Sequence, residues 1–252
     1  MNAPRVLRTL VVDDEAPARA LLREYLGAHD DIAVVGECAN GFDAVKAVPE
    51  QRADLVFLDV QMPKLDGFEV LELLDPRPAV VFCTAYDEFA LRAFEVNAVD
   101  YLLKPFGRER LAEALARVRE RLAAGTPAPA PPATALAAAA RPPGRWLERL
   151  LVRDGANVHV VPIEKLDYVE AQDDYVAIHA EGRSWLKHEP LAAVAAALDP
   201  DRFVRVHRSY VVAVDRIARL ELYAKDSRVA ILADGRQLPV SRAGYTRLRE
   251  LM

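Results

Sequence analysis

Cysteine is scarce in this sequence of 252 residues, which contains only Cys38 and Cys83. Both end short apolar segments, and this favours buried free thiols in a reducing compartment over a disulfide framework or a thiolate metal site. Long hydrophobic runs are absent too, because no run approaches the roughly 18 residues that span a membrane. The first residues also lack the apolar core and cleavage site of a signal peptide. We therefore expect a cytoplasmic protein that has no membrane partner.

A strong charge of one sign is also missing. The chain carries 33 basic and 38 acidic residues, for a net charge of −5. Residues 1–124 hold 15 basic and 22 acidic residues, and residues 145–252 hold 17 and 16. This balance excludes a polybasic tail, although arginine predominates over lysine in the second part. The hydrophobic share of 52% and the charged share of 28% exclude a disordered chain and suffice for a buried core.

A proline- and alanine-rich segment divides the sequence. Residues 125–144 contain 6 of the 17 prolines and 8 alanines, and Arg141 is their only charged residue. Such a composition cannot build a core, so it predicts a linker between a domain at 1–124 and a second domain at 145–252.

The two predicted domains have different hydrophobic periods. Five nearly continuous apolar runs, RTLVV, IAVVG, DLVFL, AVVFC and VDYLL, alternate with helical segments in the first domain. Strands buried on both sides have this pattern, which predicts an α/β doubly wound, five-stranded parallel sheet. In the second domain, Gly-containing turns separate short runs of period two, which predicts a mostly β domain built from hairpins. Its one clear helix is PLAAVAAAL at 190–198.

Polar residues follow the predicted strands of the first domain. Asp13 and Asp14 follow the first strand, Asp59 follows the third, Thr84 follows the fourth and Lys104 follows the fifth. Ligands bind at the carboxyl ends of such strands, so we expect the five side chains to converge. Neighbouring carboxylates repel one another unless a cation shares their site, and oxygen ligands suit Mg²⁺. Asp59 then becomes a nucleophile toward phosphorus, and the predicted product is an aspartyl phosphate.

The first domain resembles the receiver domain of two-component response regulators over about residues 1–124. Four segments carry the resemblance: VVDDE at 11–15, FLDVQMPKLDG at 57–67, FCTAYDE at 82–88 and DYLLKPF at 100–106. It implies that Asp59 is the phosphoacceptor, that Asp14 binds Mg²⁺ directly and that Asp13 binds it partly through water. It also implies that Gln61 is a metal ligand through its backbone carbonyl.

The same resemblance assigns roles around the phosphoryl group. It implies that Thr84 and Lys104 contact the phosphate and that Tyr101 is an aromatic switch that changes rotamer with them. It implies a cis peptide bond before Pro105. A sensor histidine kinase is the implied phosphodonor, and phosphorylation is implied to drive homodimerisation of the receiver.

The second domain offers no catalytic set. His159, His179, His188 and His207 lie in different predicted hairpins without metal-binding spacing, and no serine sits in a GxSxG elbow. We therefore expect no enzymatic output domain. The interpretation that assigns this half no specific function is a soluble β domain with charged outer faces.

Three segments of the second domain resemble the LytTR DNA-binding domain. They are LDYVEAQDDYVAIH at 166–179, FVRVHRSYVVAVDRI at 203–217 and LPVSR at 238–242. The resemblance implies binding of double-stranded DNA through loops that enter successive major grooves. The nominated contacts are Asp173, Tyr175, His207, Arg208, Ser209 and Arg242. Ala213 stands where members of this family commonly carry an asparagine, and an alanine can still meet a thymine methyl group.

Our leading hypothesis is a phosphorylation-controlled transcription regulator that binds a repeated DNA site as a dimer. A second hypothesis keeps the receiver but makes the β domain a protein-interaction module without DNA binding. A third makes the first domain a phosphatase of the haloacid-dehalogenase type. That type needs a second aspartate two residues after its nucleophile, whereas position 61 is Gln61.

Overall fold

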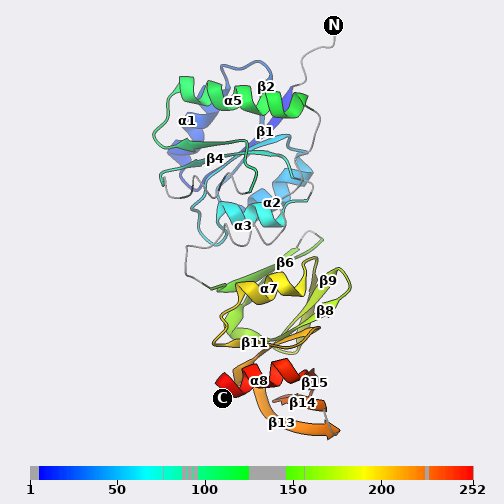
Figure 1. Ribbon diagram of the computed structural model, residues 1–252. Helices are drawn as coiled ribbons and strands as arrows, with labels where there is room; N and C mark the ends of the chain where they lie inside the picture. Colours follow the sequence, from blue (N-terminus) through cyan, green and yellow to red (C-terminus); the bar gives the residue numbers. More distant parts are fainter. Residues whose placement is uncertain are drawn as a thin grey trace. The chain divides into compact units, whose positions relative to one another are not determined.

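The computed structural model describes residues 6–75, 77–86, 89, 93, 96–124, 146–155, 157–224 and 227–251. It divides into two compact units, Met1–Ala140 and Arg141–Met252. The predicted linker at 125–144 lies outside the described residues. Both units are drawn in Figure 1.

The first unit is built on a parallel sheet of five strands in the order β2-β1-β3-β4-β5. The strands are β1 (Leu7–Val12), β2 (Ile32–Cys38), β3 (Leu55–Leu58), β4 (Ala79–Thr84) and β5 (Asp100–Leu103). The described helices are α1 (Ala16–Leu26), α2 (Gly41–Glu50), α3 (Gly67–Leu73) and α5 (Arg108–Ala123). The doubly wound parallel sheet predicted from the five apolar runs is thereby confirmed.

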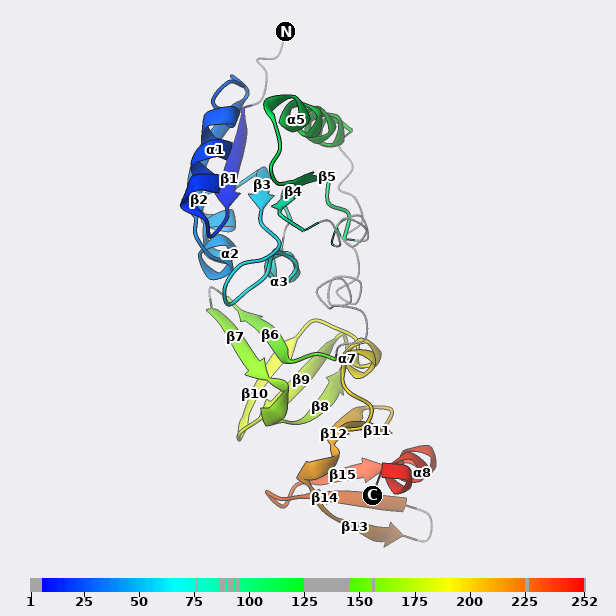
Figure 2. The ribbon, with the colours of Figure 1, turned by 90° about the vertical axis from the view of Figure 1, so that its left-hand side faces the viewer.

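Helices cover both faces of this sheet. Side chains of α1 and α5 pack with one face of β1, β3, β4 and β5 in a single buried cluster. Helices α2 and α3 contact each other on the opposite side of the sheet (Figures 1 and 2). Burial on both faces explains why β3 reads Leu-Val-Phe-Leu without alternation, since all four side chains are inaccessible to solvent. Cys38 and Cys83 are buried free thiols, as predicted.

Helix α3 begins close to the end of β3. Asp66 accepts a hydrogen bond from the Glu69 amide, and the Glu69 carboxylate accepts one from the Asp66 amide, at 2.8 Å each. This capping box fixes where the helix begins. A Cβ atom on Gly67 would collide with the backbone carbonyl of Asp59, so only glycine permits this approach.

The second unit contains one five-stranded antiparallel sheet in the order β10-β9-β8-β12-β11, a three-stranded sheet in the order β13-β14-β15 and the two-stranded ribbon β6-β7. Its strands are β6 (Arg149–Asp154), β7 (Asn157–Pro162), β8 (Leu166–Gln172), β9 (Tyr175–Ala180), β10 (Arg183–Lys187), β11 (Phe203–His207), β12 (Tyr210–Ala213), β13 (Ile217–Ala224), β14 (Ser227–Leu232) and β15 (Gln237–Val240). Its helices are α7 (Leu191–Ala197) and α8 (Arg242–Leu251).

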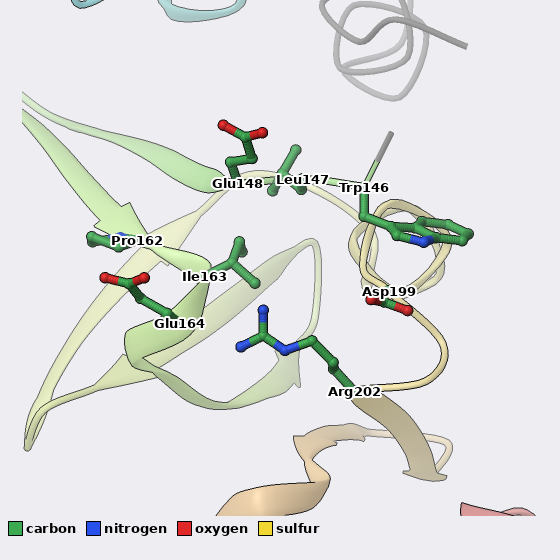
Figure 3. Close-up of a pocket in the computed structure, with 8 residues that line it drawn as sticks. All are labelled: Trp146, Leu147, Glu148, Pro162, Ile163, Glu164, Asp199 and Arg202. Carbon is green, nitrogen blue, oxygen red and sulfur yellow. The ribbon is translucent and has the colours of Figure 1, made fainter. Parts of the chain in front are cut away.

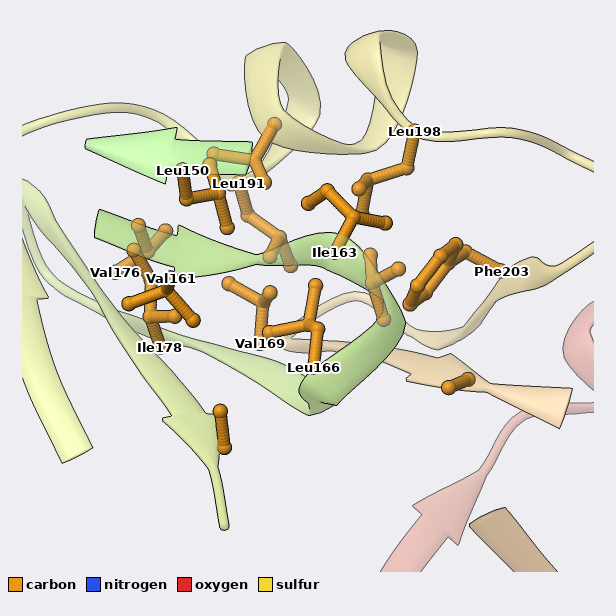
Figure 4. Packing of buried hydrophobic residues seen from close by; sticks show 14 of the residues in the cluster. Leu150, Val161, Ile163, Leu166, Val169, Val176, Ile178, Leu191, Leu198 and Phe203 are labelled. Atoms are coloured by element: carbon orange, nitrogen blue, oxygen red, sulfur yellow. The ribbon is translucent and has the colours of Figure 1, made fainter. Parts of the chain in front are cut away.

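Both faces of the five-stranded sheet are covered. One face packs against α7 and the β6-β7 ribbon around Leu166, Val169 and Phe203 (Figure 4). The other face packs against β14, β15 and α8 around Tyr168, Val206 and Leu248. The mostly β class predicted from the period of two is confirmed, and the hairpins β6-β7, β9-β10 and β14-β15 are present, each with a turn that contains glycine.

The predicted helix at 190–198 is present as α7, but the expectation that it is the one clear helix of this unit was wrong. Helix α8 is a second one, and its sequence RAGYTRLREL carries few apolar residues. Only Gly244 and Leu248 are buried in it. Its position is set by contacts with distant strands, and a local hydrophobic pattern does not record such contacts.

A buried ion-pair network joins β5 to α5. Asp100 is 3% exposed and accepts two hydrogen bonds from Arg110, at 2.7 and 2.8 Å, and one from Arg117 at 2.6 Å. Arg110 also donates to the backbone carbonyl of Tyr101, at 2.8 Å. Burial by itself would raise the pKa of Asp100, but the arginines outweigh it and lower that pKa.

We expect Asp100→Asn to destabilise this corner of the first unit by about 2 kcal/mol at neutral pH, because charged hydrogen bonds are lost. Because the pKa of Asp100 is lower in the folded chain, its contribution is present above the unfolded value near 4 and is lost as the pH falls. The free energy of unfolding should therefore fall less steeply below about pH 4 in the variant than in the wild type. Hydrogen exchange of β5 and α5 peptides measures this. The exposed Asp30→Asn is the control, and equal protection in both variants would contradict the prediction.

Candidate functional sites

Polar side chains from four strands meet at the carboxyl edge of the parallel sheet. Asp13 directly follows β1, Asp59 directly follows β3, Thr84 ends β4 and Lys104 directly follows β5. Strands β1 and β3 are neighbours in the middle of the order β2-β1-β3-β4-β5. The winding of the chain reverses between them, and ligands of such sheets bind outside this point.

The Lys104 ammonium joins two of the carboxylates. Its Nζ lies 2.6 Å from Oδ2 of Asp13 and 2.8 Å from Oδ2 of Asp59. Asp13 is inaccessible to solvent and Asp59 is 6% exposed. The exposed Glu15 is a more distant neighbour, with its Oε2 4.0 Å from the same nitrogen. Glu15 is a residue that the sequence reasoning missed.

Burial and charge act in opposite directions on this cluster. Burial raises the pKa of Asp59, although the hydrogen bond from Lys104 opposes the rise. Burial by itself would lower the pKa of Lys104, but the hydrogen bonds to Asp13 and Asp59 outweigh it and raise that pKa. The lysine is therefore held as a cation between two acids.

Asp14 adds a third carboxylate to the cluster. One carboxylate oxygen each from Asp13, Asp14 and Asp59 lie within 4.8 Å of one another. Asp14 is exposed, and the backbone N–H of Gln61 donates to Oδ1 of Asp59 at 3.2 Å. A cluster of hard oxygen donors that is partly open to solvent has the chemistry that Mg²⁺ requires.

Thr84 and Tyr101 lie on neighbouring strands close to this cluster. The Thr84 hydroxyl is buried and has no hydrogen-bond partner among the described residues. Tyr101 is 9% exposed, and its hydroxyl donates to the backbone carbonyl of Tyr86. The peptide bond between Lys104 and Pro105 is cis, which confirms that prediction.

In the second unit, His207 ends β11, and Arg208 and Ser209 form the turn between β11 and β12. The Ser209 carbonyl accepts a hydrogen bond from the backbone N–H of Ala171, at 2.8 Å. The guanidinium of Arg205 donates to the Arg208 carbonyl, also at 2.8 Å. Both bonds hold the backbone of the turn while the Arg208 side chain stays exposed.

The next nominated residues lie in the turn after β8 and at the start of β9. Asp173 has a positive φ of 51° and is exposed. Tyr175 is 47% exposed, and its ring lies 5.0 Å from that of His188. Since Ala171 also belongs to β8, this turn and the β11–β12 turn are braced against each other.

Arg242, the last nominated residue, is exposed at the start of α8. It follows Ser241, whose backbone N–H donates to the Val206 carbonyl at 2.8 Å. Val206 in turn precedes His207. The structure thus brings all three nominated segments into one region of the second unit.

A pocket of about 520 Å³ lies elsewhere in this unit (Figure 3). Glu148 and Glu164 approach it from the β6-β7 side, and Asp199 and Arg202 approach it from the connection between α7 and β11. Three carboxylates and one guanidinium do not complement a phosphodiester backbone. None of the nominated DNA contacts lines this pocket.

Comparison with known proteins identifies both domains. A model of the response regulator receiver domain matches residues 9–116, and a model of the LytTr DNA-binding domain matches residues 156–252. The chain is 36% identical to an uncharacterized response regulatory protein of Shewanella oneidensis, with 98% of each chain covered. The chain belongs to the LytTR family of response regulators. It is therefore a phosphorylation-controlled, DNA-binding regulator of transcription.

Two further relatives carry regulatory names. The positive alginate biosynthesis regulatory protein of Pseudomonas aeruginosa is 38% identical, with 98% of this chain and 99% of that one covered. The transcriptional regulatory protein BtsR of Salmonella typhi is 32% identical, with 97% and 98% covered. Neither domain match of this response regulator is to a catalytic domain.

One sequence interpretation of the DNA-binding domain was wrong. Ala213 is only 3% exposed and packs in the core with Phe203, with which it is paired across β11 and β12. Its methyl group points into the domain because alternate residues of β12 face this core. Ala213 is thus not available to a thymine methyl group in this conformation.

The sequence reasoning also missed the network at Asp100. Arg110 and Arg117 are seven residues apart, which places them on one face of a helix, and this spacing was a usable signal. Across the described residues of this response regulator, no helix has the length and apolar character needed to cross a membrane.

Proposed function

We propose that Asp59 accepts a phosphoryl group from a sensor histidine kinase. The observation that carries this proposal is the position of Asp59, next to β1 and directly after β3, with the Lys104 ammonium at 2.8 Å. The ammonium offsets the negative charge that would otherwise repel an incoming phosphoryl group. Asp59 keeps 6% of its surface exposed, which leaves a path for the donor.

We propose further that Asp13, Asp14, Asp59 and the backbone carbonyl of Gln61 hold Mg²⁺. The close approach of the three carboxylates supports this, because such a set is unfavourable without a shared cation. When bound, the ion supplies charge neutralisation for the carboxylates and the phosphoryl oxygens. Lys104 would remain beside Asp59 as the second cation of the site.

The proposed response to phosphorylation involves Thr84 and Tyr101. A phosphoryl group on Asp59 adds about −1.5 to −2 charges. The Thr84 hydroxyl at the end of β4 has no hydrogen-bond partner among the described residues, and its bond to phosphate would leave room for Tyr101 to move. The expected consequence is homodimerisation of the receiver.

The proposed DNA contacts of the second unit are Asp173, Tyr175, His207, Arg208, Ser209 and Arg242. Backbone bonds between Ala171 and Ser209, and between Val206 and Ser241, support their acting together. We expect a dimer to bind a repeated site in double-stranded DNA. The domain bounds proposed for this arrangement are 1–124 and 145–252, with a linker at 125–144.

The protein is proposed to act in the cytoplasm, and its receiver to assist only its own Mg²⁺-dependent phosphorylation and dephosphorylation. A β domain that binds only a protein partner is the competing proposal. Each neutralised phosphate contributes about −0.9 to the slope of log affinity against log salt, so a steep negative slope excludes that competitor. The LytTr match over 156–252 favours DNA.

Asp59→Asn should abolish labelling by a radioactive phosphodonor, because the nucleophilic carboxylate is lost. Release of the label by hydroxylamine distinguishes an aspartyl phosphate, which is an acyl phosphate, from a phosphoserine, which resists hydroxylamine. The exposed Asp75→Asn is the matched control and should label like the wild type. Label that persists on Asp59→Asn at the same stoichiometry would refute the assignment.

Removal of Mg²⁺ should slow labelling of the wild type by at least about tenfold, because the carboxylates then lack their shared cation. A chelator followed by Mg²⁺ add-back measures this. Asp13→Asn should need more Mg²⁺ for half-maximal labelling. Metal-independent transfer at the original rate would count against the roles given to Asp13 and Asp14.

Arg242→Ala should weaken DNA binding by about tenfold, or about 1.4 kcal/mol, with little loss of folding. A guanidinium on phosphate would also make the salt slope shallower by about 0.9, whereas a base contact would relax sequence preference. Arg249→Ala, at an exposed position of the same helix, is the control. Unchanged affinity would show that Arg242 is an ordinary surface charge that makes no contact with DNA.

A further inference from the structure

The backbone of Val206 lies at an irregularity of the β11–β12 ladder. The strand register shifts between Arg205 and His207, which places Val206 in a β-bulge. A bulge takes backbone groups out of the regular ladder and redirects the strand. The Val206 carbonyl instead accepts two hydrogen bonds from Ser241, from its backbone N–H at 2.8 Å and from its hydroxyl at 2.9 Å.

The Ser241 hydroxyl also caps helix α8. It accepts a hydrogen bond from the Gly244 amide at 3.1 Å, and the Ser241 carbonyl accepts the first helical bond from Tyr245 at 2.9 Å. One hydroxyl therefore donates to β11 and accepts from the first turn of α8. A serine can do both because it has one proton and two lone pairs.

Gly244 lets the helix approach β11 this closely. A Cβ atom at this position would overlap three backbone atoms of Val206, its Cα, its carbonyl carbon and its carbonyl oxygen. None of these atoms can rotate away as a flexible side chain would. Glycine is among the poorest helix formers, so its place in the first turn of α8 is explained by this contact.

The contact joins two segments that are proposed to bind DNA. His207 directly follows Val206, and Arg242 directly follows Ser241, so no flexible spacer separates either residue from the contact. On the other side, the Ala171 amide fixes the Ser209 carbonyl at 2.8 Å. The distance between the β11–β12 turn and the start of α8 is thus set by backbone groups.

We propose that Ser241 and Gly244 are positioning residues for DNA recognition, which hold Arg242 at a fixed distance from the His207–Ser209 turn so that both engage one site. This inference rests on the proposed DNA contacts. It assigns a role to two side chains that themselves touch no DNA. Ser241 and Gly244 should affect the affinity for DNA only by placing the Arg242 side chain.

The experiment uses the full chain, phosphorylated by acetyl phosphate with Mg²⁺. The probe is a duplex enriched by the wild type from a randomised pool, compared with an unrelated duplex of equal length. Gly244→Ala should weaken binding to the enriched duplex by about tenfold, because a misplaced guanidinium loses its bidentate contact. Binding to the unrelated duplex should change by less than about twofold, because it depends on net charge.

A double-mutant cycle separates positioning from stability. In an Arg242→Ala background, Gly244→Ala should cause no further loss of affinity for the enriched duplex. Leu248→Ala, which removes a buried side chain of α8 but leaves the Val206 contact, is the control. It should lower the thermal midpoint while keeping the ratio of enriched to unrelated binding within about twofold of the wild type.

Ser241→Ala and Ser241→Thr give a second route should Gly244→Ala fail to fold. Ser241→Ala keeps the backbone bond but loses the hydroxyl, so preference for the enriched duplex should fall, and Ser241→Thr should restore it. Additive losses in the cycle, or wild-type preference in a folded Gly244→Ala or Ser241→Ala, would overturn the inference. Failure of the wild type to enrich any duplex would instead contradict the proposed DNA binding itself.

Discussion

The Lys104 ammonium lies between the carboxylates of Asp13 and Asp59, and the carboxyl edge of the parallel sheet depends on this pairing. Two carboxylates less than 5 Å apart repel each other by roughly 3–4 kcal/mol at the effective dielectric of a protein. A third, Asp14, adds to that repulsion. The sheet topology brings these groups together regardless, because β1 and β3 are neighbours. The cluster therefore needs positive charge in its midst, and Lys104, directly after β5, supplies part of it.

The two units bring their functional side chains together by different arrangements of the backbone. In the first unit, side chains converge because parallel strands all end at one edge. In the second, antiparallel strands end at both edges, so turns must be braced individually. The Val206 bulge and the bond from Ala171 to Ser209 do this for the β11–β12 turn. Glycine allows the closest approach in both units, at Gly67 below Asp59 and at Gly244 against Val206.

These arrangements of the backbone explain which features of the structure could be predicted from the sequence. The parallel sheet was predictable because five apolar runs needed burial on both faces, and the residues after them were therefore placed at one edge. Helix α8 was not predicted, and its position is fixed by the bond of Ser241 to Val206, which lies on a strand thirty-five residues earlier in the chain. Burial of Ala213 was missed because a resemblance gives a residue's place in a motif and not the face of the strand on which it lies.

The Thr84 hydroxyl is the group through which phosphorylation of Asp59 is proposed to change the structure of the receiver. A buried polar group without a partner costs about 1–3 kcal/mol, and Thr84 has none among the described residues. A phosphoryl group on Asp59 would offer that hydroxyl an anionic acceptor, so phosphorylation would relieve the penalty. Moving a population from mostly inactive to mostly active needs up to about 5.5 kcal/mol. Relief at Thr84 would supply a substantial part of it, and new contacts of Tyr101 and of a dimer would have to supply the remainder.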